Sequence, residues 1–305
     1  MPEHQPQPES YESRLELFCE RLGLKDQWEA QVKALNETGI LEILPESQDI
    51  GVVGIDGKEY PIPTYQDILA RITSEKMELL ERKLAQGFSK LQLIPMAMPL
   101  DILIDRYKRE LIKHSQTGTL LSTDNTPLEL NLEDPLYVWE EYKKADSAGR
   151  LVYYPQRFDQ NHQGKTKQEL INQGDSWEIN LVEETVDIPA QGHGQTLGGR
   201  KQLEANQSPN AFLNSILNDP QYQGEQGLTP EARLILAITH LHQTNQVIDD
   251  YRGQGKACYS VGAFFPAGSR VPHGFFYRDH RQALLDRDHP DYQDSDYGAG
   301  SSVNI

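Results

Sequence analysis

The chain lacks the residues that a disulfide-rich or membrane-spanning fold would need. It has only two cysteines in 305 residues, Cys19 and Cys258, which lie far apart in the sequence. This spacing excludes a disulfide scaffold and a cysteine-based zinc site, and leaves a single bridge open. No window approaches eighteen apolar residues, and the first ten residues have no basic or apolar segment. We therefore expect no signal peptide, no transmembrane helix and, by default, a cytoplasmic location, with surface display left open.

Basic residues are also scarce. The chain has 29 Lys and Arg against 46 Asp and Glu, which gives a formal net charge of -17 and a pI near 4.9. Attraction to nucleic acid or to anionic lipid needs clustered Lys and Arg. We therefore expect neither nucleic-acid binding nor direct membrane insertion.

Lysine and glutamate disappear near the C-terminus. The chain contains 14 Lys and 25 Glu, so even usage would place about six of them after Lys256, and none is there. Residues 273–305 also lack Met and Trp but are crowded with Tyr, Asp, His, Arg and Ser. A disordered acidic tail would have few aromatic residues, whereas this segment contains Phe275, Phe276 and Tyr277. A compositional accident is the alternative explanation.

Motifs that would indicate an enzyme or a cofactor site are incomplete. Gly194 and Gly199 have the outer spacing of a phosphate-binding loop, but Arg200 and Lys201 replace its Lys and Ser/Thr. The chain has no G-x-S-x-G or H-E-x-x-H motif. His240 and His242 lie two residues apart on a predicted helix and so cannot share a metal ion. We therefore expect no enzymatic activity and no cofactor.

Hydrophobic periodicity predicts a helix-rich first half. Thr64 and Asp67 form a capping box for one of these helices, and Asp56-Gly57 is a turn between two strands. Helices are predicted at residues 11–24, 25–39, 65–87, 100–114 and 136–145, and extended segments at 40–44, 50–63 and 90–99.

After Arg150 the pattern becomes strand-like, with one long helix predicted at 229–251. Thr229 would cap this helix, Pro230 would begin it, and Asp249 and Asp250 would close it. Strands are predicted at 150–158, 176–188, 257–265, 273–285 and 301–305. We expect an α+β chain with a helix-rich N-terminal region (1–146) and a C-terminal domain (147–305).

The C-terminal motifs resemble those of a known family. They are "AGSR" at 267–270, "GFFYR" at 274–278, "RQA" at 281–283 and the ending "DYGAGSSVNI" at 296–305. This arrangement is similar to the variable proteins of diversity-generating retroelements, whose last domain has a C-type-lectin-like fold. Gly300 stands where the closing motif of that family has Arg. Other segments, including "GIDGKEYPIP", resemble candidate-phylum bacterial proteins without an established activity.

The resemblance also accounts for the unusual composition. In that family template adenines are copied to any base, and the affected codons are typically AAC or AAT. Changing the first two bases of such codons never gives Lys, Glu, Gln, Met or Trp, but readily gives Tyr, Asp, His, Arg and Ser. The resemblance therefore implies a variable segment at about 262–305, in which Gln282 and Gln293 occupy constant positions.

Side chains of this kind suit adaptable binding surfaces, because aromatic rings supply contact area and short polar groups supply orientable hydrogen bonds. Such a surface needs a fixed backbone beneath it, and we expect the 229–251 helix to pack under it as part of this support. The positions predicted to hold the backbone are Val261, Ala263, Phe265, Val271, Pro272, Ala283, Leu285, Gly298, Ala299 and Val303. The predicted exposed contact residues are His273, Phe275, Tyr277, Asp279, His280, Asp286, Asp288, His289, Asp291, Tyr292, Asp294, Asp296 and Tyr297.

The first hypothesis is a non-enzymatic ligand-binding protein whose diversified surface recognises a macromolecular partner, a protein or a cell-surface ligand. The alternative is a metal-dependent hydrolase that uses His273, His280, His289 and the surrounding Asp residues. The segment "HPDYQDSDYG" resembles a calcium loop but lacks its central Gly and terminal Glu. In a third class, a structural protein, replacing Tyr277 or Tyr292 would harm folding and not binding.

Overall fold

The computed structural model describes residues 10–147, 149–185 and 187–305, and they form an α+β fold. The segment in which we expected no signal peptide, residues 1–9, lies outside the described residues. Within the described ranges, no helix has both the length and the apolar character needed to cross a membrane. The α-helices are α1 (Tyr11–Leu22), α2 (Leu24–Glu37), α3 (Tyr65–Arg71), α4 (Ser74–Ala85), α5 (Leu100–Gln116), α6 (Lys167–Asn172), α7 (Pro209–Asn218) and α8 (Pro230–Thr244).

Strands from distant parts of the chain form the sheets. The N-terminal strands are β1 (Glu42–Ile43), β2 (Ile50–Val53), β3 (Glu59–Pro61), β4 (Phe88–Ile94), β5 (Leu136–Val138), β6 (Val152–Tyr153) and β7 (Glu178–Glu183). The remaining strands are β8 (Thr196–Leu197), β9 (Arg200–Lys201), β10 (Gln226–Gly227), β11 (Asp250–Tyr251), β12 (Ala257–Tyr259), β13 (Ala263–Phe264), β14 (Val271–Tyr277), β15 (Gln282–Asp288), β16 (Tyr297–Ala299) and β17 (Ser301–Asn304). Short 3₁₀ helices include η1 (Glu140–Lys144) and η4 (Arg278–His280).

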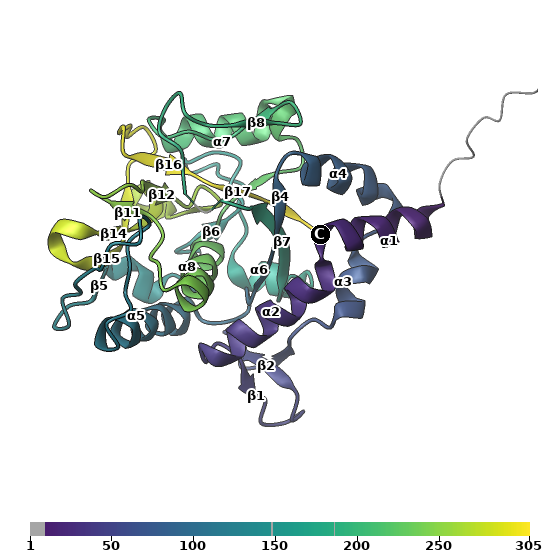
Figure 1. Cartoon of the computed structure of the whole chain (residues 1–305), viewed down its shortest axis with the longest axis horizontal. Coiled ribbons are helices and arrows are strands. Elements are labelled where there is room, and N and C mark those ends of the chain that lie inside the picture. Colours follow the sequence, from purple (N-terminus) through teal and green to yellow (C-terminus); the bar gives the residue numbers. More distant parts are fainter. Residues whose placement is uncertain (1–9, 148, 186) are drawn as a thin grey trace, which may run out of the picture.

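Two sheets determine the architecture. A four-stranded antiparallel sheet has the order β10-β17-β7-β4, and a larger mixed sheet has the order β16-β12-β14-β15-β5, with β11 beside β14. Helix α8 packs against both α5 and β4. Figure 1 shows the N-terminal helices α1 to α4 on one side of the molecule and β14, β15 and β5 on the opposite side. The last strand, β17, follows β16 directly and so joins the two sheets.

One hydrophobic core runs through both halves of the chain. It includes Phe18 in α1, Leu91 in β4, Ile235 in α8 and Ile305 at the C-terminus. In the four-stranded sheet, β4 pairs with β7, so residues on either side of position 147 share hydrogen bonds. The division into an N-terminal region and a C-terminal domain stays a prediction, while the core and this sheet extend across it.

The local signals for helix starts are confirmed. The Thr64 side chain accepts from the Asp67 amide while Asp67 accepts from the Thr64 amide, which forms the predicted capping box. Thr229 caps α8, and Pro230 is its first helical residue. Each of these two threonine side chains accepts a hydrogen bond from a backbone amide that has no partner within the helix.

The prediction of one helix over 65–87 is wrong, because the chain breaks between α3 and α4. Ile72 has an extended backbone with φ -80° and ψ 94°, and Thr73 starts the next helix with φ -92° and ψ 165°. The Tyr11 hydroxyl donates to the freed Ile72 carbonyl. This turn places Ile72 and Met77 in the same core, so tertiary packing overrides the continuous helical pattern.

Two further helix predictions need correction. Residues 136–145 do not form an α-helix, because Leu136–Val138 pairs with β15 as a parallel strand and only the 3₁₀ helix η1 follows. The helix predicted to reach residue 251 ends at Thr244. Asn245 adopts the left-handed conformation at φ 65°, and its amide donates to the Leu241 carbonyl. Asp249 and Asp250 therefore lie beyond the helix.

A buried group of polar and charged side chains joins five segments of the chain. The Glu225 carboxylate accepts from Lys83 Nζ in α4 at 2.6 Å, from Arg200 in β9 at 2.7 and 2.9 Å, and from the Ser301 hydroxyl in β17 at 2.6 Å. Arg200 also pairs with Glu183 in β7. The Lys83 and Glu225 side chains have no exposed surface. We call these five residues the Glu225 cluster.

Replacing Glu225 by Gln should destabilise the fold strongly. The substitution leaves Lys83 and Arg200 buried with too little negative charge, and breaking a buried pair in this way costs about 3–5 kcal/mol. Urea unfolding of the full chain would measure the loss. Glu141→Gln, which removes an exposed pair with Arg150, is the matched control and should change the free energy of unfolding by less than about 0.5–1 kcal/mol. Equal effects of the two substitutions would contradict the role of the cluster.

Glu178 in β7 should make stability depend on pH. This side chain is 4% exposed, and burial raises its pKa to about 7 although Tyr154 and Asn180 donate to it. The folded protein therefore retains a proton that the unfolded chain loses near pH 4.5. The retained proton stabilises the fold at low pH, and this stabilisation is lost as the pH rises towards 7. At about 1.4 kcal/mol per pKa unit, the loss is about 3 kcal/mol.

The test is to compare urea unfolding of Glu178→Gln and the wild-type chain between pH 4.5 and 8. The stability of the variant relative to wild type should rise with pH by about 3 kcal/mol. The exposed Glu133→Gln controls for the general loss of negative charge. A difference between Glu178→Gln and wild type that stays constant with pH would show that Glu178 titrates normally in the fold.

Candidate functional site

The two faces of the six-stranded sheet have different environments. Along β14, Phe276 points into the main core, whereas His273, Phe275 and Tyr277 lie on the other face, because side chains alternate along a strand. The register places Asp286 of β15 directly opposite His273 on that same face. The sheet therefore covers the main core with one face and carries the rings on the other, where Tyr259 and Val271 pack in a second core cluster with Phe212.

The positions predicted to hold the backbone are buried, as expected. All ten belong to the buried class, and eight of them are among the hydrophobic core residues of the chain. Glycine is required at 298, where a Cβ atom would lie 2.3 Å from the Cγ2 atom of Ile188. The predicted burial of these ten positions is therefore confirmed.

Seven rings form a connected cluster on this face, which we call the aromatic face. Tyr297 in β16 lies at its centre, with ring centroids 5.2 Å from His273, 5.8 Å from Tyr251 and 5.9 Å from Tyr292. Most neighbouring pairs meet edge to face, which is a favourable geometry for aromatic rings. The aromatic face comprises Tyr251, Tyr259, His273, Phe275, Tyr277, Tyr292 and Tyr297.

Of the thirteen predicted contact residues, five are exposed and six are partly exposed, and the prediction of exposure is wrong for His273 and Phe275. Their exposed fractions are 3% and 8%. Phe275 is covered by neighbouring rings, with its ring centroid 4.9 Å from that of Tyr251 and 6.0 Å from that of Tyr297. The side chains become more exposed along β14 towards Tyr277. His273 and Phe275 thus support the aromatic face from below, while Tyr277, Tyr292 and Tyr297 reach its surface.

One edge of the aromatic face is the turn between β14 and β15. His280 in η4 packs on Tyr277 with ring centroids 4.1 Å apart. Asp279 is exposed at the same turn. Across from them, the Arg252 guanidinium lies 5.3 Å from the centre of the Tyr251 ring. Both predicted residues at this turn therefore adjoin the face.

The opposite edge is the loop between β15 and β16. Its backbone is fixed by hydrogen bonds from the Asn210 amide to the Pro290 carbonyl, from the Ala257 amide to the Asp296 carbonyl, and from the Asn206 amide to the Tyr297 carbonyl. Exposed side chains project from it at His289, Asp291 and Tyr292, while Asp294 and Asp296 are partly buried.

Acidic groups give this end of the face a negative field. Burial raises the pKa of the Tyr259 and Tyr297 hydroxyls, and the nearby carboxylates of Asp288 and Asp294 raise it further. The pKa of Tyr292 is raised by burial and by its hydrogen bond to Asp294. The two carboxylates and three tyrosines therefore share one environment.

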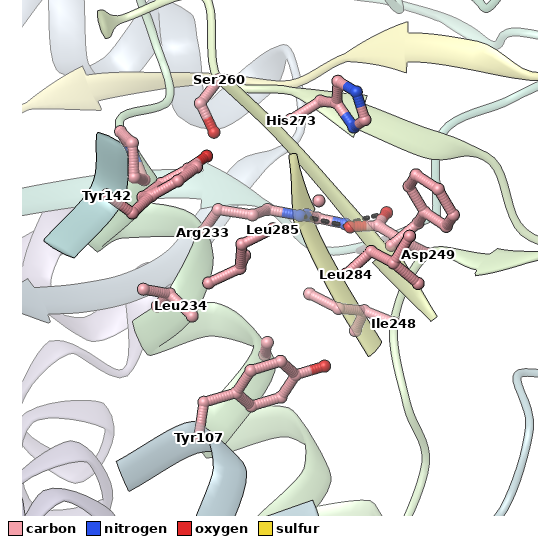
Figure 2. Close-up of a pocket in the computed structure, with 14 residues that line it drawn as sticks. Tyr107, Tyr142, Arg233, Leu234, Ile248, Asp249, Ser260, His273, Leu284 and Leu285 are labelled. Atoms are coloured by element: carbon pink, nitrogen blue, oxygen red, sulfur yellow. Dashed lines mark hydrogen bonds and ion pairs between the residues drawn. The ribbon is translucent and has the colours of Figure 1, made fainter. Parts of the chain in front are cut away.

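Beneath the sheet, a buried ion pair fixes the segment that carries Tyr251. Figure 2 shows Arg233 of α8 extending to Asp249, with the His273 ring directed away from this pair. The Asp249 carbonyl accepts from the amides of Tyr251 at 2.8 Å and Phe276 at 2.9 Å. Burial raises the pKa of Asp249 to about 6, although Arg233 acts in the opposite direction. The pair adjoins a cavity of about 30 Å³, too small for a ligand beyond one or two waters.

Tyr251 and Tyr259 were missed as site residues by the sequence analysis. Tyr251 was assigned to the end of a helix, but Asn245 ends that helix earlier and Tyr251 pairs with Tyr277 through β11. The available signal was Asn245, because asparagine often ends a helix and an acidic, Gly-containing segment follows it. Tyr259 was predicted to lie in a strand, but the side of the sheet that its ring occupies was not predicted.

The metal-dependent alternative receives no support from the geometry. His273 pairs with Asp288, His289 lies near Asp291, and His280 packs on Tyr277. In the part of the chain that the structure describes, no three His, Cys, Asp or Glu side chains are placed to share an ion. The phosphate-loop-like segment is also engaged elsewhere, since its Arg200 lies in the Glu225 cluster.

The chain was compared with protein-family models, curated proteins and solved structures, and none of them matches it. The aromatic face therefore has to be interpreted from its own geometry and chemistry.

Proposed function

We propose that the chain is a non-enzymatic ligand-binding protein that recognises a macromolecular partner through the aromatic face. The observation that carries this proposal is the separation of roles on one sheet. On one face, the exposed Tyr292 and the partly exposed Tyr251, Tyr277 and Tyr297 lie over buried rings, whereas Phe276 and Ala283 on the other face are buried in the main core. Tyrosine and short polar side chains on a rigid support are typical of surfaces that bind proteins.

The retroelement hypothesis is part of this proposal. Support comes from the resemblance of the C-terminal motifs, the absence of Lys and Glu after Lys256, and the position of the constant residue Gln282. The Gln282 side chain donates to the Asp134 carbonyl at 2.7 Å, so it has a structural role that exchange would disrupt. A C-type-lectin-like C-terminal domain belongs to the same hypothesis.

If the exposed positions are exchangeable, substitutions there should leave the fold intact. Tyr292→Ser, at a side chain that is 43% exposed, and His280→Ser should each change the free energy of unfolding by at most about 1 kcal/mol. Phe276→Ser, on the buried face of the same sheet, should cost about 3–5 kcal/mol. Urea unfolding would measure all three.

Binding is tested by displaying the full chain with random residues at Tyr277, Asp279, His280, Tyr292 and Asp294. Selection against several unrelated proteins should yield specific binders that fold like the parent. A library of equal size at exposed α1 positions, Glu12, Ser13, Glu16, Leu17 and Glu20, is the control. If most variants of the first library unfold, or if both libraries perform alike, the proposal fails.

The genetic part of the hypothesis has its own test. The DNA next to the gene should contain a near-copy of the segment for residues 262–305 that differs mainly at adenines, with a reverse transcriptase gene nearby. Finding neither would overturn the retroelement assignment and leave the binding proposal to the display experiment.

A further inference from the structure

The aspartates around the aromatic face fall into two groups. Asp286 pairs with Arg287, with Nη1 and Oδ1 3.1 Å apart, and Asp296 pairs with Lys256. Asp279, Asp288, Asp291 and Asp294 differ, because no Lys or Arg of the described residues lies within ion-pair distance of any of them. Asp279 and Asp291 are exposed, whereas Asp288 and Asp294 are partly buried. Two partly buried carboxylates are thus left without a cation beside the rings.

The present partners of these two carboxylates include no Lys or Arg. Asp288 lies 3.1 Å from Nε2 of His273. Asp294 accepts from the Tyr292 hydroxyl at 3.1 Å and from the Asp296 amide at 2.8 Å. The other ring nitrogen of His273, Nδ1, is buried without a hydrogen-bond partner among the described residues, although buried polar atoms normally have one. The polar groups at this end of the face are therefore incompletely paired.

Three tyrosine rings adjoin these carboxylates. Tyr259 lies 5.3 Å and Tyr292 5.9 Å from Tyr297, measured between ring centroids. Asp288 and Asp294 both act on the hydroxyls of all three. Rings beside a carboxylate are a favourable environment for a cation, which gains both ionic attraction and contact with the ring faces. A neutral side chain would cover the carboxylates without replacing their hydration, which is costly.

We infer that the partner is a protein segment that places an Arg or Lys side chain between Asp288, Asp294 and the rings of Tyr292 and Tyr297. This inference rests on the proposed function, since it specifies the ligand of the same aromatic face. Arginine fits best, because its planar guanidinium can stack on tyrosine and donate two hydrogen bonds to a carboxylate. The net charge of -17 also attracts basic partners from a distance.

The test is a selection of displayed random peptides on the full wild-type chain at low salt. Enriched peptides should contain Arg or Lys in excess of the starting library. A synthetic copy of the best peptide with citrulline in place of Arg should bind at least tenfold more weakly, because citrulline keeps the shape and loses the charge. Raising the salt concentration should weaken the Arg peptide more than the citrulline peptide.

Substitutions assign the binding to these two carboxylates. Asp288→Asn and Asp294→Asn should each weaken the Arg peptide at least fivefold, whereas Asp105→Asn, at an exposed position on α5, should not change its binding. Thermal unfolding checks that each variant folds. If Asp288→Asn disturbs the packing of His273, the affinity of the Arg peptide for Asp294→Asn, at a partly exposed position, decides the test.

The outcomes separate the two proposals. If selected peptides lose binding on Tyr292→Ser but have no excess of basic residues and tolerate Asp294→Asn, the inferred cation is wrong and the binding function stands. If no selected peptide depends on any residue of the aromatic face, both proposals fail.

Discussion

The Glu225 cluster is the interaction on which the arrangement of the chain depends. Its two carboxylates, Glu183 and Glu225, balance its two cations, Lys83 and Arg200, so the buried site has no net charge. The Arg200 guanidinium is further covered by the Phe88 ring, whose centre lies 4.6 Å away. A buried charge is tolerated only when its partners are in place. Helix α4 and strands β7, β9 and β17 must therefore all be in place for the cluster to be stable.

This requirement extends to the aromatic face through the end of the chain. Ser301 belongs to the Glu225 cluster, and Tyr297, at the centre of the aromatic face, lies only four residues before it. Between them Gly300 connects β16 to β17, and a Cβ atom there would lie 2.8 Å from the Cδ1 atom of Leu228. Placing β17 between β10 and β7 thus also positions Tyr297. The second support, the Arg233–Asp249 pair, positions Tyr251 from below.

The features that could be predicted from the sequence are those that depend on composition and on residues close together in the chain. The capping residues Thr64 and Thr229, the α+β class and the buried positions of the last segment were all predicted from composition and spacing. The strand at Leu136–Val138 was not, because its pairing with β15 joins residues about 150 positions apart. The break at Ile72 also depends on tertiary packing. Within the site, composition identified the kind of residue, but it could not show that Phe275 is buried against Tyr251 and Tyr297.

Both main-chain hydrogen bonds and side-chain contacts fix the loop between β15 and β16. The hydrogen bonds at Pro290, Asp296 and Tyr297 use main-chain carbonyls, which every residue provides. Their donors are the amides of Asn206, Asn210 and Ala257, all outside this loop. Side chains of the loop add further contacts, since Asp294 accepts from the Asp296 amide and Asp296 pairs with Lys256. Because the main-chain bonds do not depend on side-chain identity whereas these contacts do, the side-chain exchange of the proposed function would disturb the loop less at its exposed positions than at Asp294 and Asp296.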